Sequence, residues 1–281
     1  MKRIALQNFN NKVVIITGAS LGVGAESAQL FAEQGAKLVL IARGKQALDE
    51  ISDKLRQLTE VMSFSLDVCD TQQYQTILRQ VEAQFGEINI LINNAGFHKR
   101  GDVEKNAPDD LNKMVAVNLS APITLSALTL PYIQKAGGGA IVNVGSLAGR
   151  APLQGAATYA ATKAGLRAFT YALADEIENP NIHIGVVSPG PIDTGFIMSE
   201  IDQVEDIVFS QPMSTARQVA EAIMAIAAGK SVEICLPTSG GVLTMISYLF
   251  PWLRRKLRPA LYRKGNKAKE KYRARNQRQS D

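Results

Sequence analysis

The sequence predicts an α/β protein with a doubly wound parallel sheet of seven strands flanked by helices. Short apolar runs rich in β-branched residues alternate with amphipathic stretches along most of the 281 residues. Parallel strands joined by crossover helices are the simplest arrangement for such an alternation. Hydrophobic residues make up 46% of the chain and charged residues 20%, which suits one large core and excludes a disordered or disulfide-scaffold protein.

The first half of the chain contains four predicted strands, each followed by a predicted helix. The run KVVIIT at 12–17 is apolar and β-branched and ends before Gly18, which is typical of a strand buried on both faces. A helix is predicted over 21–35, because apolar residues recur at helical spacing and Gly35 stands where a helix ends. The same alternation predicts strands at 37–42, 61–67 and 88–94 and helices at 45–59 and 71–85.

The second half continues this pattern and ends in a segment of different composition. It predicts helices over 108–135, 156–178 and 215–229, strands at 139–146, 182–189 and 231–237, and a mixed region of loop and helix at 192–214. We therefore predict one domain over residues 1–237, followed by an apolar segment and a basic tail at 238–281.

The sequence also predicts a cytoplasmic protein without a metal site. The start of the chain is basic but lacks the apolar stretch of a signal peptide, and no run reaches the about 18 unbroken apolar residues of a membrane-spanning helix. Cys69 and Cys235 fit neither a disulfide framework nor a zinc site, so a reducing compartment is expected and no metal is. His183, inside a predicted strand, is interpreted as structural, whereas a substrate contact of His98 stays open.

The turn TGASLGVG at 17–24 lies between the first strand and the first helix, where a dinucleotide-binding loop is found. Gly18 permits the tight turn, Gly22 a close approach to a pyrophosphate, and Gly24 close packing of helix on strand. The spacing G-x3-G-x-G differs from the usual fingerprint, and a plain tight turn is the alternative. We predict a Rossmann-type cofactor site here, to which the intervening residues also contribute: Ser20, Leu21 and Val23.

The residue at the end of the second strand bears on the choice of cofactor. An NAD enzyme usually has an aspartate or glutamate there, which binds the ribose 2′-hydroxyl. Here the strand ends in Arg43, whose guanidinium can pair with a 2′-phosphate through two hydrogen bonds. We therefore predict NADP(H) rather than NAD(H), with a solvated arginine as the alternative.

Polar residues of the second half are candidates for proton chemistry. Tyr159 and Lys163 are four residues apart on a predicted helix, so their side chains lie on one face. Poising a tyrosine near neutral pH requires about 4 kcal/mol of preferential stabilisation of the phenolate, which a lysine ammonium favours. Ser146 ends the preceding strand, at the edge where open α/β sheets bind ligands. Asn118 is unfavourable inside its predicted helix, which hints at a further role. Taken alone, the Tyr159 and Lys163 pair is more simply a surface pair.

Taken together, the motifs of residues 10–237 resemble those of the short-chain dehydrogenase/reductase family. They are TGASLGVG at 17–24, Asp67-Val68, NNAG at 93–96, Asn118, Ser146, the pair Tyr159 and Lys163, and SPGPIDT at 188–194. The resemblance implies that Tyr159 is the general acid or base, and that Lys163 lowers its pKa and holds the nicotinamide ribose. It also implies that Ser146 orients a carbonyl and that Asn118 holds a water of a proton relay.

The same resemblance implies a set of cofactor contacts along the sheet edge. Asp67 and Val68 would contact the adenine. The residues that would line the cofactor or border the nicotinamide are Asn94, Ala95, Gly96, Pro189, Gly190, Ile192 and Thr194.

The sequence therefore predicts an NADP(H)-dependent oxidoreductase that reduces a ketone or aldehyde by hydride transfer, with Tyr159 donating the proton. A non-catalytic NADP(H)-binding sensor or scaffold of the same fold is the alternative, and the intact Ser146, Tyr159 and Lys163 argue against it. The expected partners are a small carbonyl or alcohol substrate and further copies of the chain, in a dimer or tetramer.

The end of the chain departs from this family pattern. Between Trp252 and Asp281 there are 12 lysines and arginines and two acids, so the rest of the chain is mildly acidic. The apolar run 242–253 is too short to span a bilayer, but next to this basic tail it suits peripheral binding to anionic lipid. Such contact at the cytoplasmic face of a membrane would favour a lipophilic substrate, held by the apolar loop at 196–214. The alternative is a segment packed on the body or on a partner subunit, with a disordered basic end. Nucleic acid is not an expected partner.

Overall fold

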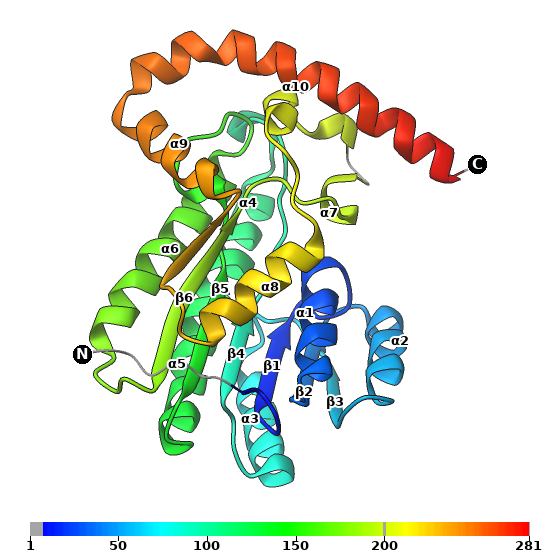
Figure 1. Cartoon of the computed structure of the whole chain (residues 1–281), viewed down its shortest axis with the longest axis vertical. Helices are drawn as coiled ribbons and strands as arrows, with labels where there is room; N and C mark the ends of the chain where they lie inside the picture. The colour runs from blue at the N-terminus through cyan, green and yellow to red at the C-terminus, as the bar shows by residue number, and fades with distance from the viewer. Residues whose placement is uncertain (1–7, 199–200, 281) are drawn as a thin grey trace.

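The computed structural model describes residues 8–198 and 201–280, with side chains up to Ala274, and it has the predicted doubly wound sheet (Figure 1). In this described part, seven parallel strands pair in the order β3-β2-β1-β4-β5-β6-β7. They are β1 (Val13–Thr17), β2 (Lys37–Ala42), β3 (Val61–Ser65), β4 (Ile90–Asn93), β5 (Gly139–Val144), β6 (Ile182–Pro189) and β7 (Glu233–Leu236). The order reverses between β1 and β4, and ligands of such sheets bind at this reversal, beyond the carboxyl ends of the strands.

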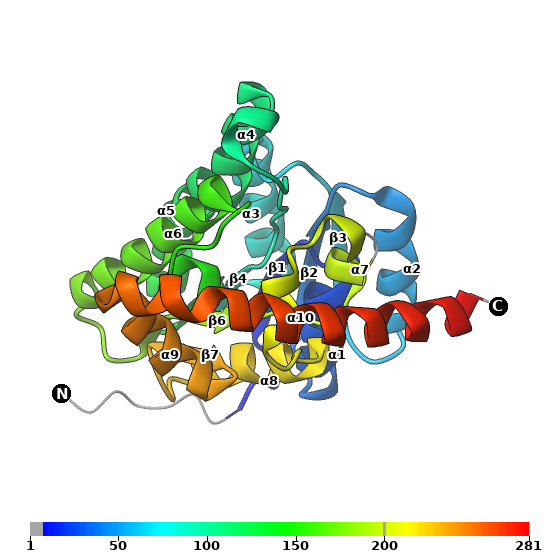
Figure 2. The same cartoon turned by 90° about the horizontal axis from the view of Figure 1, so that it is seen from above.

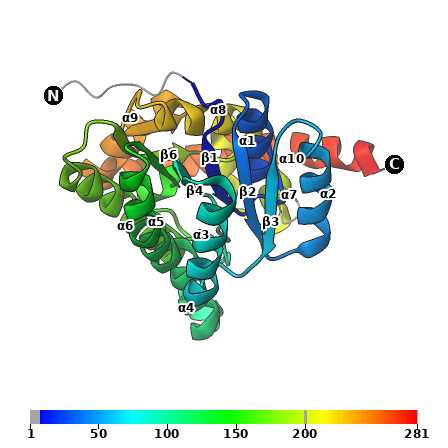
Figure 3. The ribbon, with the colours of Figure 1, turned by 90° about the horizontal axis from the view of Figure 1, so that it is seen from below.

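Helices cover both faces of the sheet (Figure 3). One face is covered by α1 (Gly22–Glu33), α2 (Lys45–Leu55) and α8 (Ala216–Ala227), and the other by α3 (Thr71–Phe85), α5 (Ala121–Lys135) and α6 (Ala157–Glu176). All residues of β1 are buried: Val14 and Ile16 pack toward the first group of helices, and Val13 and Ile15 toward the second. The two-sided burial predicted from the run of β-branched residues is therefore confirmed.

The long helix predicted over 108–135 is interrupted by one wide turn. It consists of α4 (Pro108–Val115), a π-helical turn η2 (Ala116–Ser120) and α5. Among the described residues, this stretch is the one helix with the length and hydropathy to cross a membrane. Its α5 part packs against β4 and β5, with Leu125 and Ile133 in the core, so a core helix accounts for its apolar composition.

In its described residues, the predicted mixed region after β6 contains short helical turns and a single β-bridge between Ile192 and Ser214. The turns are α7 (Gly195–Met198), η4 (Ile201–Gln203) and η5 (Asp206–Ser210). Two further short turns, η1 (Val103–Lys105) and η3 (Leu147–Gly149), follow β4 and β5. All of these connections lie at the carboxyl edge of the sheet or lead to it, which leaves their side chains available to a site there.

The C-terminal segment is helical. α9 (Thr238–Leu249) begins directly after β7, and α10 (Pro251–Ser280) extends as a long bar over the carboxyl edge of the sheet (Figures 1 and 2). α10 packs on η5, where Lys269 Nζ donates to the Val204 carbonyl at 2.7 Å and lies 3.0 Å from an Asp206 carboxylate oxygen. The alternative of a disordered basic end is therefore wrong over the described residues, because acids of the loop after β6 hold this half of the tail.

Candidate active site

A cavity of about 1070 Å³ opens at the carboxyl edge of the sheet, beside the point where the strand order reverses. Nearly all of the predicted site residues line it. They are Gly18, Ser20, Leu21, Gly22, Val23, Arg43, Asp67, Val68, Asn94, Ala95, Gly96, Ser146, Tyr159, Lys163, Pro189, Gly190, Ile192 and Thr194. The fold thus brings segments from the whole length of the body to one hollow, because the carboxyl ends of parallel strands share one edge.

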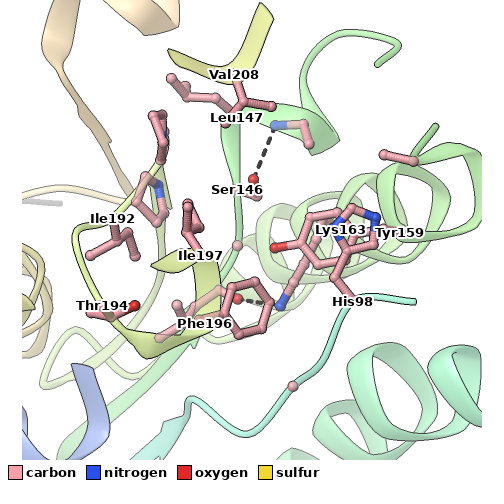
Figure 4. Close-up of a pocket in the computed structure, with 18 of the residues that line it drawn as sticks. His98, Ser146, Leu147, Tyr159, Lys163, Ile192, Thr194, Phe196, Ile197 and Val208 are labelled. Atoms are coloured by element: carbon pink, nitrogen blue, oxygen red, sulfur yellow. Dashed lines mark hydrogen bonds between the residues drawn. The ribbon is translucent and has the colours of Figure 1, made fainter. Parts of the chain in front are cut away.

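Ser146, Tyr159 and Lys163 meet at the floor of this cavity. Ser146 follows β5, and the other two lie one turn apart on α6, which packs beside that strand. Figure 4 shows the Tyr159 hydroxyl and the Ser146 side chain facing the same space. The Ser146 Oγ also accepts a hydrogen bond from the Ala148 amide at 3.1 Å, which holds the side chain in place. A carbonyl oxygen in this space would meet two hydroxyl groups.

Tyr159 lies in a buried environment. Burial raises the pKa of Tyr159, and the hydrogen bond with Ser146 and the charge of Arg100 oppose this only in part. A lowering of this pKa by Lys163 stays a prediction. The Lys163 ammonium lies 5.8 Å from the ring centroid of Tyr159 and donates to the Val144 carbonyl at 2.8 Å. Burial lowers the pKa of Lys163 itself to about 8.

Asn118 does not line the cavity, although the sequence places it in the site. It is fully buried in the π-helical turn η2, and its side chain pairs with both backbone groups of Phe97. The Phe97 amide donates to Oδ1 at 3.0 Å, and Nδ2 donates to the Phe97 carbonyl at 2.8 Å. The wide turn directs the side-chain amide of Asn118 toward the segment after β4, where it holds the backbone of Phe97. Its role with a relay water stays a prediction.

The glycine-rich turn is held by the segment after β4. Asn94 Nδ2 donates to the carbonyls of Thr17 at 2.9 Å and Gly18 at 3.0 Å, and the Thr17 hydroxyl accepts from the amides of Asn94 and Ala95. Gly24 also lies outside the cavity lining, unlike the other predicted cofactor residues of this turn. A Cβ on Gly24 would be 2.1 Å from the Gly18 carbonyl oxygen, so its absence allows helix and turn to touch.

The cavity fits the phosphates of a dinucleotide at two helix N-termini. α1 begins at Gly22 and α2 at Lys45, and no side chain caps either first turn. N–H groups at such ends are well placed to bind phosphate oxygens. Gly18 and Gly22 have φ of +64° and +55°, a conformation that glycine adopts without strain, and both line the cavity. Arg43 is exposed directly before the start of α2, where a guanidinium can reach a phosphate on the ribose.

His98 lines the cavity beside Tyr159, and whether it contacts the substrate stays a prediction. Its ring stacks on that of Tyr159 with centroids 4.3 Å apart and planes 20° apart (Figure 4). The Nδ1 atom lies 3.0 Å from Arg100 Nη1, and since a guanidinium only donates, Nδ1 accepts and the ring proton sits on Nε2. Burial, aided by the charge of Arg100, lowers the pKa of His98 to about 3, so the ring is neutral at physiological pH.

The other histidine is placed as predicted. His183 is buried in β6 and packs against Gly229, where an added Cβ would be 2.6 Å from the ring. This confirms the structural interpretation of His183.

The outer wall of the cavity comes from the loop after β6 and from the C-terminal helices. The loop contributes apolar side chains, as predicted: Phe196, Ile197, Ile207 and Val208. The C-terminal helices contribute residues that the sequence did not assign to the site: Leu243, Thr244 and Ser247 of α9, and Leu261 and Lys264 of α10. The only signal for these residues was the apolar run beside a basic tail, which does not indicate where that run folds.

Comparisons of the sequence agree with the motifs. The family profile described as short chain dehydrogenase matches residues 12–205. An uncharacterized oxidoreductase of Staphylococcus saprophyticus is 37% identical over 206 residues, which cover 72% of this chain and 83% of that protein. The 3-oxoacyl-(acyl-carrier-protein) reductase FabG of Escherichia coli K12 is 32% identical over 242 residues, which cover 84% of this chain and 98% of the reductase.

Comparisons of the structure show the same fold with either of two cofactors. A metagenomic short-chain oxidoreductase solved in complex with NADP is 27% identical, with a TM-score of 0.68 over 81% of this chain and 97% of that one. A short chain dehydrogenase from Mycobacterium paratuberculosis, solved bound to NAD, has a TM-score of 0.76 over 83% of this chain and 99% of that one. At 19% identity, the second likeness shows the fold alone.

Proposed function

The chain belongs to the short-chain dehydrogenase family of oxidoreductases, and we propose that it reduces a ketone or an aldehyde to an alcohol with NADPH. One observation carries this proposal: two hydroxyl groups and a buried lysine, from Ser146, Tyr159 and Lys163, lie at the floor of a single cavity that also contains the glycine-rich turn. The related reductase FabG acts on a 3-oxoacyl group, which is a carbonyl compound of the same general class.

Ser146, Tyr159 and Lys163 have separate roles in the transfer of the proton to the substrate. Ser146 donates a hydrogen bond to the substrate oxygen and orients it, and Tyr159 gives that oxygen a proton as negative charge develops on it. Because burial raises the pKa of Tyr159, the residue is protonated at neutral pH, which is the form that an acid in the reductive direction requires. Lys163, with a pKa lowered to about 8, still bears a positive charge at pH 7 and stabilises the resulting tyrosinate.

The cofactor would be held by the turn at 18–23, by Asp67 and Val68 and by the segment at 94–96, and it supplies the hydride that the carbonyl carbon accepts. NADP(H) is the proposed form, because Arg43 stands at the end of β2 and no acidic side chain follows it before α2. The cytoplasm is the proposed location. A homo-oligomer is the proposed assembly, supported by the exposed apolar residues Val115 on α4 and Tyr171 on α6.

Replacement of Arg43 by aspartate is expected to weaken the binding of NADPH about 10- to 100-fold and to leave that of NADH unchanged or improved. The variant loses a charge-assisted hydrogen bond to the 2′-phosphate, and it gains an acceptor for a 2′-hydroxyl. Dissociation constants of both cofactors, measured by fluorescence titration, check this. An Arg56→Asp variant, changed at the far end of α2, is the matched control and should keep the original preference. An unaltered preference in Arg43→Asp would remove the case for NADP(H).

The reaction itself is tested by following cofactor oxidation at 340 nm, with NADPH and NADH in parallel. The substrates are aliphatic, aromatic, steroid and acyl-thioester carbonyl compounds. Turnover with NADPH is the expected result, and the substrates accepted would define the class. Tight NADPH binding without turnover on any of these compounds, whether soluble or embedded in lipid vesicles, would contradict the reductase proposal and favour a nucleotide-binding sensor or scaffold.

A further inference from the structure

α9 packs on the body through small and polar residues and exposes its large apolar residues, which is the reverse of the usual pattern for a surface helix. The side facing the body carries glycines and hydroxyl groups: Gly240, Gly241, Thr244 and Ser247. The remaining residues from 242 to 249 are apolar and exposed: Val242, Leu243, Met245, Ile246, Tyr248 and Leu249. A surface helix normally buries its apolar stripe. We call these six residues the outer face of α9.

The inner face is closely fitted, so the helix is not free to turn its apolar side inward. A Cβ on Gly240 would be 2.6 Å from a Leu147 methyl, and one on Gly241 would be 2.8 Å from the Cys235 sulfur. Arg150, directly after η3, donates to the Thr244 hydroxyl at 3.3 Å and to the Gly241 carbonyl at 3.3 Å. The outward position of the apolar side is therefore built into the contact between α9 and the body.

The exposed apolar surface continues into a group of basic residues. Phe250 and Trp252 are exposed at the turn into α10, and the next turns carry the basic cluster Arg254, Arg255, Lys256 and Arg258. No acid occurs between residues 238 and 269. Arg254, Arg255 and Lys256 form no ion pair with any described residue, whereas farther along α10 Lys269 and Arg273 pair with Asp206 and Asp202. Among the described residues, ion pairs between the tail and the body thus occur only in the far half of α10.

We propose that the outer face of α9 and the basic cluster dock on a membrane surface that contains anionic lipid. Apolar and aromatic side chains next to arginines and lysines match the boundary between acyl chains and negatively charged headgroups. α9, with 12 residues, is about 18 Å long and lies on such a surface, because it cannot cross a hydrocarbon core of about 30 Å. A second copy of the chain fits less well, since a symmetric contact would bring two basic clusters together.

Docking in this way places the open end of the cavity against the lipid. Leu243 belongs to the outer face of α9 and also lines the cavity, and Leu261 of α10 is both exposed and part of the lining. Residues that are exposed and line a cavity mark its rim. Resting on the proposed reductase function, we infer that the substrate is a lipophilic aldehyde or ketone that enters from the membrane.

Trp252 provides a direct test of the docking, because it is the only tryptophan of the chain. Vesicles of phosphatidylcholine with 30% phosphatidylglycerol are titrated into the full-length protein while its tryptophan emission is recorded. The expected result is a shift to shorter wavelength, together with flotation of the protein with these vesicles, and much weaker effects with pure phosphatidylcholine. An unchanged emission without flotation would overturn the proposal.

Two variants separate the apolar contribution from the electrostatic one. Tyr248→Ser with Leu249→Ser keeps Trp252 and is expected to bind the anionic vesicles at least 10-fold more weakly. Arg255→Gln with Lys256→Gln is expected to bind about 30-fold more weakly, with less dependence on salt. Leu58→Ser and Lys230→Gln, exposed residues elsewhere on the body, are the matched controls and should bind as the wild type does. If all variants bound the anionic vesicles equally well, the outer face of α9 and the basic cluster would not be the membrane-binding surface.

Two further outcomes distinguish the alternatives. A shift of Trp252 emission that depends on protein concentration without vesicles, and that Leu249→Ser abolishes, would assign the face to a second copy and overturn the lipid proposal.

Turnover is compared on a long-chain aldehyde embedded in anionic vesicles and on a short soluble one. The charge variant should lose about 30-fold only on the embedded substrate; equal rates would overturn the entry route. Absence of turnover on both by the wild type would overturn the proposed reduction, while vesicle binding is measured independently.

Discussion

Replacement of Tyr159 by phenylalanine is expected to lower kcat for carbonyl reduction about 1000-fold, because it removes the group that gives the substrate oxygen its proton. The ring stays, so its stacking on His98 and the shape of the cavity are kept. Cofactor affinity should therefore stay within about twofold of that of the wild type. The measurement is steady-state turnover with the best substrate of the carbonyl series, together with a fluorescence titration of NADPH.

Tyr171 offers a control on the same helix. Its hydroxyl donates to Glu233 at 2.9 Å, away from Ser146 and Lys163, so Tyr171→Phe removes a tyrosine hydroxyl without touching the site. Its kcat should change little. If Tyr159→Phe kept a kcat comparable to that of the Tyr171 variant, Tyr159 would not be the acid and the mechanism would have to be abandoned.

Replacement of Glu233 by glutamine is expected to lower the free energy of unfolding by about 3 kcal/mol at pH 7, as is typical when one partner of a buried ion pair is removed. The Glu233 side chain in β7 is 7% exposed. It accepts hydrogen bonds from Arg167 at 2.9 Å and Ser188 at 2.7 Å, and it is also paired with Arg150. Since Arg150 also holds α9, the change would loosen the attachment of the C-terminal segment as well.

The free energy of unfolding should depend on pH through the ionisation of the Glu233 carboxylate. Burial by itself raises the pKa of Glu233, but the hydrogen bonds from Arg167, Ser188 and Arg150 lower it to about 2, from an ordinary value of 4.5. A pKa that is lower in the folded state means that the carboxylate stabilises the fold above about pH 4.5. This contribution is lost as the pH falls toward 2.

Urea unfolding of the wild type and of Glu233→Gln at pH 7, 5 and 3 measures both effects. The difference in unfolding free energy should be full at pH 7 and nearly full at pH 5, and it should shrink at pH 3. Glu60→Gln, which removes an exposed ion pair with Lys37, is the control and should change stability by less than about 1 kcal/mol. A difference for Glu233→Gln that does not vary with pH would rule out the carboxylate as its source.

The parts of the site that the sequence predicted well are those set by neighbouring residues. The pair Tyr159 and Lys163 shares a face because α-helical geometry puts residues four apart on one side. Ser146 and Arg43 reach the cavity because each follows a strand of a parallel sheet, and such strands end at one edge. The same reasoning predicted the seven strands, and no strand end differs from the structure by more than two residues.

Other features depended on contacts between segments far apart in the chain. Asn118 was placed in the site, but its amide is held by the backbone of Phe97, which only the fold brings next to the π-helical turn. Burial raises the pKa of Tyr159, and its ring stacks on His98, neither of which the helical spacing of Tyr159 and Lys163 indicates. No local pattern reports how deeply a side chain is covered, because the covering groups come from elsewhere.

The sequence by itself thus predicted the doubly wound sheet and the glycine-rich turn, because the periodicity of strands and helices follows from short-range geometry. It predicted Ser146, Tyr159 and Lys163 as one site through the resemblance of its ordered motifs to a known family. Only the tertiary structure decided which way the C-terminal helices face. The apolar composition of α9 is equally compatible with packing inward or outward, and the contact of Gly240 and Gly241 with the body selects the outward position. These glycines make room for the side chains of Leu147 and Cys235, which belong to other segments, so the outward position is a property of the assembled fold and not of α9 alone.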